Sequence, residues 1–283
     1  MRISEHVQEM SRWSEAQRRD GRRIALVPTM GFLHEAHLCL VRDGKKRADR
    51  VVVSLFVNPK QFAPSEDFAA YPRDFERDRE LLGRESIDVL FHPAAGEIYP
   101  AGFQTQVSVD KLGLFLCAPH RPGHFQGVAT VVAKLFNIVR PHVAIFGEKD
   151  YQQLQLIRRL VQDLNFDIEI VGHPIVREAD GLAMSSRNIY LSPEERQAAL
   201  CLSRSLGLGA CMVRRGETRE RVITEAVRAE IEKEPLAKVE YVTLCDSATL
   251  EAVEAVQGTA LLALAVRVGK TRLIDNRILK PME

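Results

Sequence analysis

The sequence lacks a dominant charge of either sign. Lys plus Arg number 39 and Asp plus Glu number 38, which gives a formal net charge of +1. A chain this balanced has no overall field that would attract polyanions. We therefore expect neither nucleic acid nor a membrane surface as a partner, and any anion must be bound by local geometry.

Long apolar segments and paired cysteines are also missing. No hydrophobic run approaches the ~18 residues of a transmembrane helix, and the first twenty residues have no apolar core of a signal peptide. The five cysteines, at 39, 117, 201, 211 and 245, are scattered and form no C-x-x-C pair. These features predict a cytoplasmic protein with reduced thiols.

Short apolar runs alternate with helical patterns over the first 175 residues. Runs rich in Val, Ile, Leu and Phe predict strands at 23–29, 50–57, 87–93, 142–148 and 167–174. Such continuous runs are typical of strands buried on both faces of a parallel sheet. Helical patterns fall between them, at about 34–49, 71–83, 126–140 and 150–163. The alternation predicts a doubly wound α/β fold.

The pattern changes after about residue 176. Residues 192–235 are mainly helical, with Ser192 and Pro193 as N-cap and first helical residue, and 239–250 and 259–279 predict strands. We expect two domains, 1–176 and 177–283, of which the second is a smaller α+β domain.

Two familiar phosphate-binding signatures are excluded. "VGKT" resembles the end of a P-loop, but Leu264 stands where the first glycine is required, so a hairpin turn is the better interpretation. "GLGACM" lacks the third glycine of a dinucleotide fingerprint and lies in a helical pattern.

The strongest signal is "VPTMGFLHEAHL", residues 27–38. A strand runs to Pro28, a Thr-Met-Gly turn follows, and a helix is expected to begin near His34. This junction would aim free backbone N–H groups and the positive helix end at the mouth of the sheet, where anions bind. His34 and His37 are i and i+3, so both rings would lie on one side of the first helical turn.

The spacing alone leaves alternatives open. One ring could pack while the other is solvated. A zinc pair is less favoured, because "HEAH" is one residue short of H-E-x-x-H and no third ligand is evident. We therefore assign no metal ligands.

Three later segments also place polar or cationic groups after predicted strands or before helices. "NPKQF" offers the amides of Asn58 and Gln61, although Asn58-Pro59 could simply start a turn. "HRPGHF" places Arg121 and His124 before a helix, although Arg121 could be a solvated loop charge. "FGEKDYQQL" brings Lys149 to a third junction, where Asp150 and Gln153 have capping-box spacing.

A final polar loop, "AMSSRN", lies at the expected domain boundary and could close over a polyphosphate. We expect the cationic donors of all these segments to surround one cleft: His34, His37, Arg121, His124, Lys149 and Arg187.

These blocks resemble the pantothenate synthetase (pantoate–β-alanine ligase) family over nearly the whole chain. The similarity runs from "VPTMGFLHEAHL" through "SLFVNPKQF", "YPRD", "GHFQGV", "FGEKDYQQL" and "VREADGLAMSSRN" to "RLIDN". The resemblance implies a Rossmann-like N-terminal domain, a C-terminal lid and a homodimer. It also implies the nucleotidyltransferase superfamily, which shares its histidine pair with class I aminoacyl-tRNA synthetases.

The implied reaction is an ATP- and Mg²⁺-dependent condensation of pantoate with β-alanine through a pantoyl adenylate. Carried over by position, the catalytic residues would be His37, as proton donor, His34 and Lys149. The resemblance assigns ATP binding to Met30, Gly31, His34, His37, Gly147, Glu148, Lys149, Asp150, Val176, Met184, Ser185, Ser186 and Arg187. The candidate substrate-binding residues are Gln61, Gln153, Asn58, Tyr71, Arg121 and His124.

Two positions depart from the family pattern. Ala36 replaces a glycine, so its Cβ is expected to restrict the approach of the nucleotide. Lys60 replaces a neutral residue and could attract a carboxylate or be solvated.

Two rival functions fit the motifs less well. A nucleotidyltransferase that transfers AMP to another acceptor would not need β-alanine. A non-catalytic nucleotide-binding regulator would be expected to have lost His37, Lys149 or Arg187, and all three are present.

Overall fold

The computed structural model describes residues 1–63 and 66–281. The chain divides into two compact units. The first contains residues 1–113, 118–148 and 153–174, and the second contains 114–117, 149–152 and 175–283.

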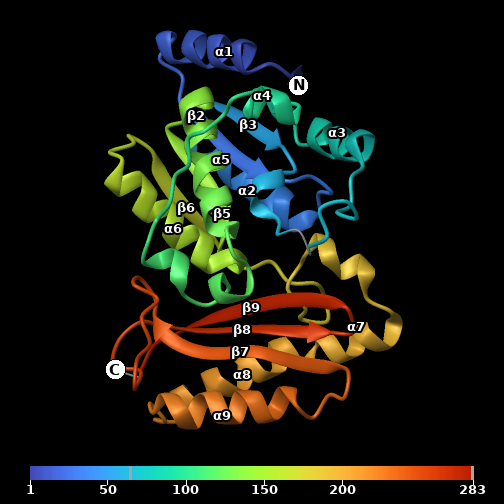
Figure 1. The fold of residues 1–283 in the computed structure, drawn as a ribbon, viewed down its shortest axis with the longest axis vertical. Coiled ribbons are helices and arrows are strands. Elements are labelled where there is room, and N and C mark those ends of the chain that lie inside the picture. The colour runs from blue at the N-terminus through green and yellow to red at the C-terminus, as the bar shows by residue number, and fades with distance from the viewer. Residues whose placement is uncertain (64–65, 282–283) are drawn as a thin grey trace. The chain divides into compact units, whose positions relative to one another are not determined.

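The first unit is built on a six-stranded sheet in the order β1-β4-β3-β2-β5-β6 (Figure 1). Every pair is parallel. The strands are β1 (Arg2–Ser4), β2 (Ile24–Thr29), β3 (Arg50–Leu55), β4 (Val89–Phe91), β5 (Val143–Gly147) and β6 (Glu169–His173). The order runs one way from β2 to β4 and the other way from β5 to β6. The carboxyl ends of β2 and β5 therefore flank a topological switch point, where ligands bind in open α/β sheets.

The four inner strands of this sheet, β2, β3, β4 and β5, are buried on both faces, as the continuous apolar runs predict, whereas the edge strands β1 and β6 are partly exposed. In β2, Ala25 and Val27 belong to a core cluster with α2, and the alternate residues Ile24 and Leu26 are also fully buried. The helices of the unit are α1 (Val7–Arg19), α2 (Glu35–Arg47), α3 (Phe75–Arg84), α4 (Ala95–Ile98), α5 (His124–Val139) and α6 (Tyr151–Asp163), whose first two residues belong to the second unit. The doubly wound fold is thus confirmed.

Several predicted boundaries were wrong. The strand expected at 50–57 ends at Leu55, because its ladder to β2 ends at the Thr29–Leu55 pair. The helix expected at 71–83 begins only at Phe75, after the N-cap Asp74. The edge strand β1 and the helix α1 were not predicted at all.

The second unit is the predicted α+β structure. Its antiparallel sheet contains β7 (Ala237–Asp246), β8 (Ala260–Val268) and β9 (Thr271–Leu279), with β8 in the centre. Its helices are α7 (Pro193–Ala199), α8 (Cys201–Arg214) and α9 (Glu220–Ile231). Ser192 caps α7, "GLGACM" lies in α8, and "VGKT" turns between β8 and β9, all as predicted. Across the described parts of the chain, no helix combines the length and apolarity needed to cross a bilayer.

Candidate active site

Residues 30–34, which we call the histidine loop, connect β2 to α2. His34 is the N-cap of α2 and His37 lies in its first turn. Their ring centroids are 4.0 Å apart, with an angle of 31° between the ring planes, so both rings lie on one side of the turn as predicted. The backbone N–H of His34 donates to Nδ1 of His37 at 3.3 Å. Because Nδ1 accepts, the neutral His37 ring carries its proton on Nε2.

The expectation of free backbone N–H groups in this loop was wrong. The N–H of Gly31 donates to Oγ1 of Thr29 at 3.3 Å, and those of Phe32 and Leu33 each donate to the carboxylate of Asp78 at 2.7 Å. Gly31 and Phe32 have φ angles of 83° and 50°, and with this backbone the amides of Phe32 and Leu33 face Asp78 of α3. A left-handed backbone at a residue with a Cβ costs roughly 1–2 kcal/mol. The loop conformation is therefore imposed by its partners.

Asn58 follows β3 and begins the 3₁₀ turn Pro59–Gln61. It is 1% exposed, and its side chain is hydrogen-bonded through both the nitrogen and the oxygen. Nδ2 donates to Oε1 of Gln61 and to the carbonyl of Gly127, both at 3.1 Å. Oδ1 accepts from the Tyr99 hydroxyl at 2.8 Å and from the N–H of Lys60 at 3.2 Å. The amide is thus committed to protein partners, and it orients Gln61.

Gln61 links the two loops that follow β2 and β3. Its Nε2 donates to Sδ of Met30 at 2.9 Å, and its Oε1 accepts from Asn58. The side chain is 7% exposed. The structure therefore brings Met30 together with Asn58 and Gln61, which were selected from a different motif.

His124 and Arg121 support this loop from the start of α5. Nδ1 of His124 lies 2.7 Å from the carbonyl of Gln61, and Nε2 lies 3.0 Å from Nη1 of Arg121. Since a guanidinium can only donate, Nε2 accepts and the ring proton is on Nδ1. Arg121 also forms a two-bond ion pair with Glu66, at 2.6 and 3.0 Å. Burial opposes the ionisation of Glu66, but Arg121 outweighs it and lowers the pKa of that carboxyl.

These contacts change the interpretation of both residues. We expected Arg121 and His124 to present cationic donors to the cleft. The Arg121 charge is instead compensated by Glu66, and His124 is a buried ring, 7% exposed, between Arg121 and Gln61. Their geometry suits them to positioning Gln61.

The first unit contains four further residues of the predicted site. Tyr71 is buried, with its ring edge against Phe62 at a centroid distance of 5.7 Å. Gly147 ends β5, Glu148 follows it, and Gln153 is half-buried in the first turn of α6. Lys60, which we expected to attract a carboxylate or be solvated, holds its ammonium 5.2 and 5.4 Å from the ring centroids of Tyr99 and Phe103.

The second unit contains the other predicted residues in two segments. Lys149 and Asp150 lie in a 3₁₀ turn, and the carbonyl of Lys149 accepts from Nδ2 of Asn276 at 3.0 Å. The second segment holds Val176, Met184, Ser185, Ser186 and Arg187, and its ends are joined by the N–H of Met184, which donates to the Val176 carbonyl at 3.0 Å. Ser185 begins a 3₁₀ turn, and its Oγ accepts from the N–H of Arg187 at 3.3 Å.

Two adjacent residues of β9 hold both segments. Asn276 binds Lys149 as described, and Asp275 accepts two hydrogen bonds from Arg177, at 2.7 and 2.9 Å. Arg177 in turn donates to the carbonyl of Gly181 at 3.0 Å, inside the segment 176–187. The motif "RLIDN" contributed to the family resemblance, but the sequence alone predicted no role for Asp275 or Asn276.

The sequence was also compared with protein families. The sequence model of the Pantoate-beta-alanine ligase family matches residues 2–278. The chain belongs to this family. The resemblance seen in the sequence is thereby confirmed.

Individual members of the ligase family align over almost their full length. The pantothenate synthetase of Geobacter sulfurreducens is 56% identical over 279 residues, which cover 99% of each chain. The solved pantothenate synthetase of Thermus thermophilus gives a TM-score of 0.94 at 44% identity, covering 99% of this chain and 100% of that one. The ligase of Francisella tularensis, solved in complex with beta-gamma ATP and β-alanine, gives 0.81 at 32% identity, covering 98% and 97%.

The close approach of α5 to the Gln61 loop leads to a prediction. A Cβ on Gly127 would lie 2.2 Å from the carbonyl oxygen of Lys60, so the loop would have to move. We expect Gly127→Ala to lower the free energy of unfolding by ~1–3 kcal/mol, the usual cost of overpacking. Thermal unfolding measures this loss. Gly207→Ala in α8 is the control, because nothing lies within 4 Å of its added Cβ. An equal effect of both changes would contradict the steric explanation.

Proposed function

We propose that this protein joins pantoate to β-alanine at the expense of ATP, forming pantothenate, AMP and pyrophosphate. The observation that carries the proposal is the family match over residues 2–278. It is supported by the adjacent His34 and His37 rings at a strand–helix junction beside the switch point of a parallel sheet.

The chemistry explains why ATP is needed. A carboxylate is a poor electrophile, because an oxide would have to leave. In the first step a carboxylate oxygen of pantoate attacks the α-phosphorus of ATP, and pyrophosphate departs. In the second step the amine of β-alanine attacks the acyl carbon, and AMP leaves with one former carboxylate oxygen. An adenylate is thus formed and consumed within one site.

We propose the following roles for the first unit. His34 and His37 bind the phosphates with Met30 and Gly31, and the Nε2 proton of His37 is donated to the charge that develops on the α-phosphate. Gln61 and Gln153 bind the hydroxyl and carboxylate groups of pantoate. Asn58, Arg121 and His124 contribute to pantoate binding by positioning Gln61. Tyr71 is a further candidate for contact with pantoate.

We propose that ATP is also bound by the loop after β5 and by segments of the second unit. These residues are Gly147, Glu148, Lys149, Asp150, Val176, Met184, Ser185, Ser186 and Arg187. Lys149 would offset the repulsion between the two anionic substrates. In this proposal the N-terminal domain binds nucleotide and pantoate, and the C-terminal domain is a lid that shields the hydrolysable adenylate from water.

Magnesium would enter with ATP as part of the substrate. Among residues 1–63 and 66–281, no group of three or more His, Cys, Asp or Glu side chains is arranged to hold a metal ion. Mg²⁺ commonly binds through substrate phosphates, waters and one or two carboxylates, so the described residues fit a nucleotide-borne ion. When bound, it would neutralise phosphate charge. Asp150, in the proposed nucleotide loop, is the carboxylate that could contact it.

The proposed reaction is tested by AMP release from the purified protein. AMP and pantothenate should form when ATP, pantoate and β-alanine are all present. With β-alanine omitted, no more than about one equivalent of pyrophosphate should appear rapidly. AMP formation that requires neither pantoate nor β-alanine would remove the support for this function.

Assembly and location are proposed on the resemblance alone. We propose a cytoplasmic homodimer. Light scattering on the eluting protein should give twice the mass of one chain, and the mass of a single chain would refute the dimer.

The role of His37 gives a second prediction. We expect His37→Ala to slow adenylation by ~10²-fold or more, the usual contribution of a positioned proton donor. The measurement is single-turnover pyrophosphate release. His6→Ala is the control, because His6 lies on an exposed N-terminal segment. Turnover near the wild-type rate in folded His37→Ala protein would contradict the role of His37 as proton donor.

The contact between Asn276 and Lys149 gives a third prediction. Removing the Asn276 amide leaves the Lys149 carbonyl without this donor, so the proposed nucleotide turn should loosen. We expect Asn276→Ala to raise the KM for ATP by ~10-fold, the equivalent of one hydrogen bond of about 1.4 kcal/mol, and to leave the KM for pantoate nearly unchanged. Thr271→Ala, at another buried polar residue of β9, is the matched control. A parallel rise in both KM values would argue for general damage.

A further inference from the structure

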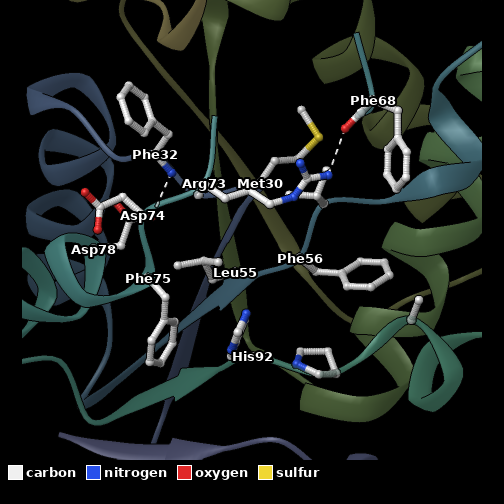
Figure 2. Close-up of a pocket in the computed structure, with 14 residues that line it drawn as sticks. Met30, Phe32, Leu55, Phe56, Phe68, Arg73, Asp74, Phe75, Asp78 and His92 are labelled. Carbon is white, nitrogen blue, oxygen red and sulfur yellow. Dashed lines mark hydrogen bonds between the residues drawn. The ribbon is translucent and has the colours of Figure 1, made fainter. Parts of the chain in front are cut away.

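Asp78 is a buried carboxylate on α3 that no part of the proposed mechanism uses. It is 1% exposed. Its two oxygens accept hydrogen bonds from the consecutive amides of Phe32 and Leu33, both at 2.7 Å. Figure 2 shows Phe32 beside Asp78. Its nearest cation is Arg77, whose Nη1 lies 3.6 Å from Oδ1. Successive N–H groups in a turn form a natural anion-binding concavity, and here a side chain of the protein fills it.

The conformation of the histidine loop depends on this contact. Gly31 and Phe32 both have positive φ angles, and Phe32 adopts one although it carries a Cβ. Such a backbone persists only where its surroundings impose it. A Cβ on Gly31 would already meet Oδ2 of Asp78 and a methyl group of Leu55 at 3.1 Å, so the loop lies close against both.

The "YPRD" block explains how α3 presents Asp78. Arg73 donates to the carbonyls of Phe68 and Tyr71, at 2.8 and 2.9 Å, and so fixes the chain before the helix. Asp74 caps α3 by accepting from the N–H of Arg77 at 3.1 Å. Asp78 follows one helical turn later, on the side of the histidine loop.

A cavity of about 230 Å³ borders the loop. It is lined by Met30, Gly31 and Phe32, by Asp78 itself, and by apolar side chains that include Phe56 and Phe75 (Figure 2). A loop that borders a cavity gains little positional restraint from that side. Together with the contacts of Gly31 to Thr29 and of Met30 to Gln61, the two hydrogen bonds to Asp78 therefore fix where the loop lies.

Burial of this carboxylate opposes its ionisation. Burial raises the pKa of Asp78, although the two amides and Arg77 oppose the shift. A carboxyl whose pKa is higher in the folded state makes the fold less stable as pH rises through that range, so the ionisation of Asp78 carries a cost in folding free energy. Asp78 carries this cost beside the site where the proposed chemistry takes place.

We propose that Asp78 is a positioning residue for the adenylation step. Its carboxylate sets the conformation of the histidine loop, and through it the places of Met30, His34 and His37 relative to the α-phosphate. This inference rests on the proposed function. A displacement of about 1 Å in such a loop can cost ~10² in rate.

The test compares Asp78→Asn with Asp74→Asn. An amide at 78 can accept from one N–H but turns an NH₂ group towards the other, whereas Asn is as good an N-cap as Asp. Both variants lie on the same end of α3, and both remove one carboxylate. Adenylation is measured as single-turnover pyrophosphate release from ATP and pantoate. The second step is measured separately, by adding β-alanine to enzyme loaded with synthetic pantoyl adenylate.

We expect Asp78→Asn to slow adenylation by ~10–100-fold and to change the β-alanine step by less than ~3-fold. Asp74→Asn should leave both steps within ~3-fold of wild type. An equal loss in both steps, or unchanged adenylation, overturns the positioning role. If Asp78→Asn does not fold, Asp78→Glu is measured in the same way, because it keeps the charge but shifts the carboxylate by one methylene. The same selective loss then supports the role, and wild-type rates overturn it.

Measurements on the wild-type protein distinguish a failure of the proposed function from a failure of the role of Asp78. If it releases no pyrophosphate from ATP and pantoate, the proposed function fails. If it does so and Asp78→Asn equals it, only the role of Asp78 fails.

Discussion

The parallel sheet of the first unit is the constraint on which the site depends. In a parallel sheet the carboxyl ends of all strands lie at the same edge. The loops that follow β2, β3 and β5 therefore begin at this edge. The reversal of strand order between β2 and β5 puts a topological switch point beside the histidine pair. Covalent connectivity and right-handed crossovers thus place the groups that we propose act on a nucleotide, before any substrate contact is made.

Buried polar contacts then fix the loops at that edge. Asp78 holds the histidine loop, Asn58 and His124 hold Gln61, and Asn276 holds the turn of Lys149. Each hydrogen bond contributes only ~0.5–1.5 kcal/mol net, but a buried group left without its partner costs ~1–3 kcal/mol. Such contacts therefore select one loop conformation more than they stabilise the fold. An active site needs this preorganisation, because dipoles set before the reaction need not be rearranged during it.

The sequence predicted the elements of the fold well and their tertiary contacts poorly. Continuous apolar runs reported five of the six parallel strands, whereas β1 spans only Arg2–Ser4 and is formed by long-range pairing with β4. The histidine pair was found because helical spacing is a local property. Asp78 was missed because it lies in "FERDRELLGR", where an acidic residue is normally interpreted as a solvated charge, and only the packed structure shows it buried. Arg121 was misinterpreted for the complementary reason, since its ion pair with Glu66 is 55 residues distant in sequence.

The most direct test of the account follows the oxygen atoms. Pantoate labelled with ¹⁸O in its carboxylate is converted in the presence of ATP and β-alanine, and the products are analysed by mass spectrometry. Attack of the carboxylate on the α-phosphorus requires one labelled oxygen to leave with AMP in every turnover. Unlabelled AMP, or label found in inorganic phosphate with ADP as the second product, would contradict the formation of a pantoyl adenylate.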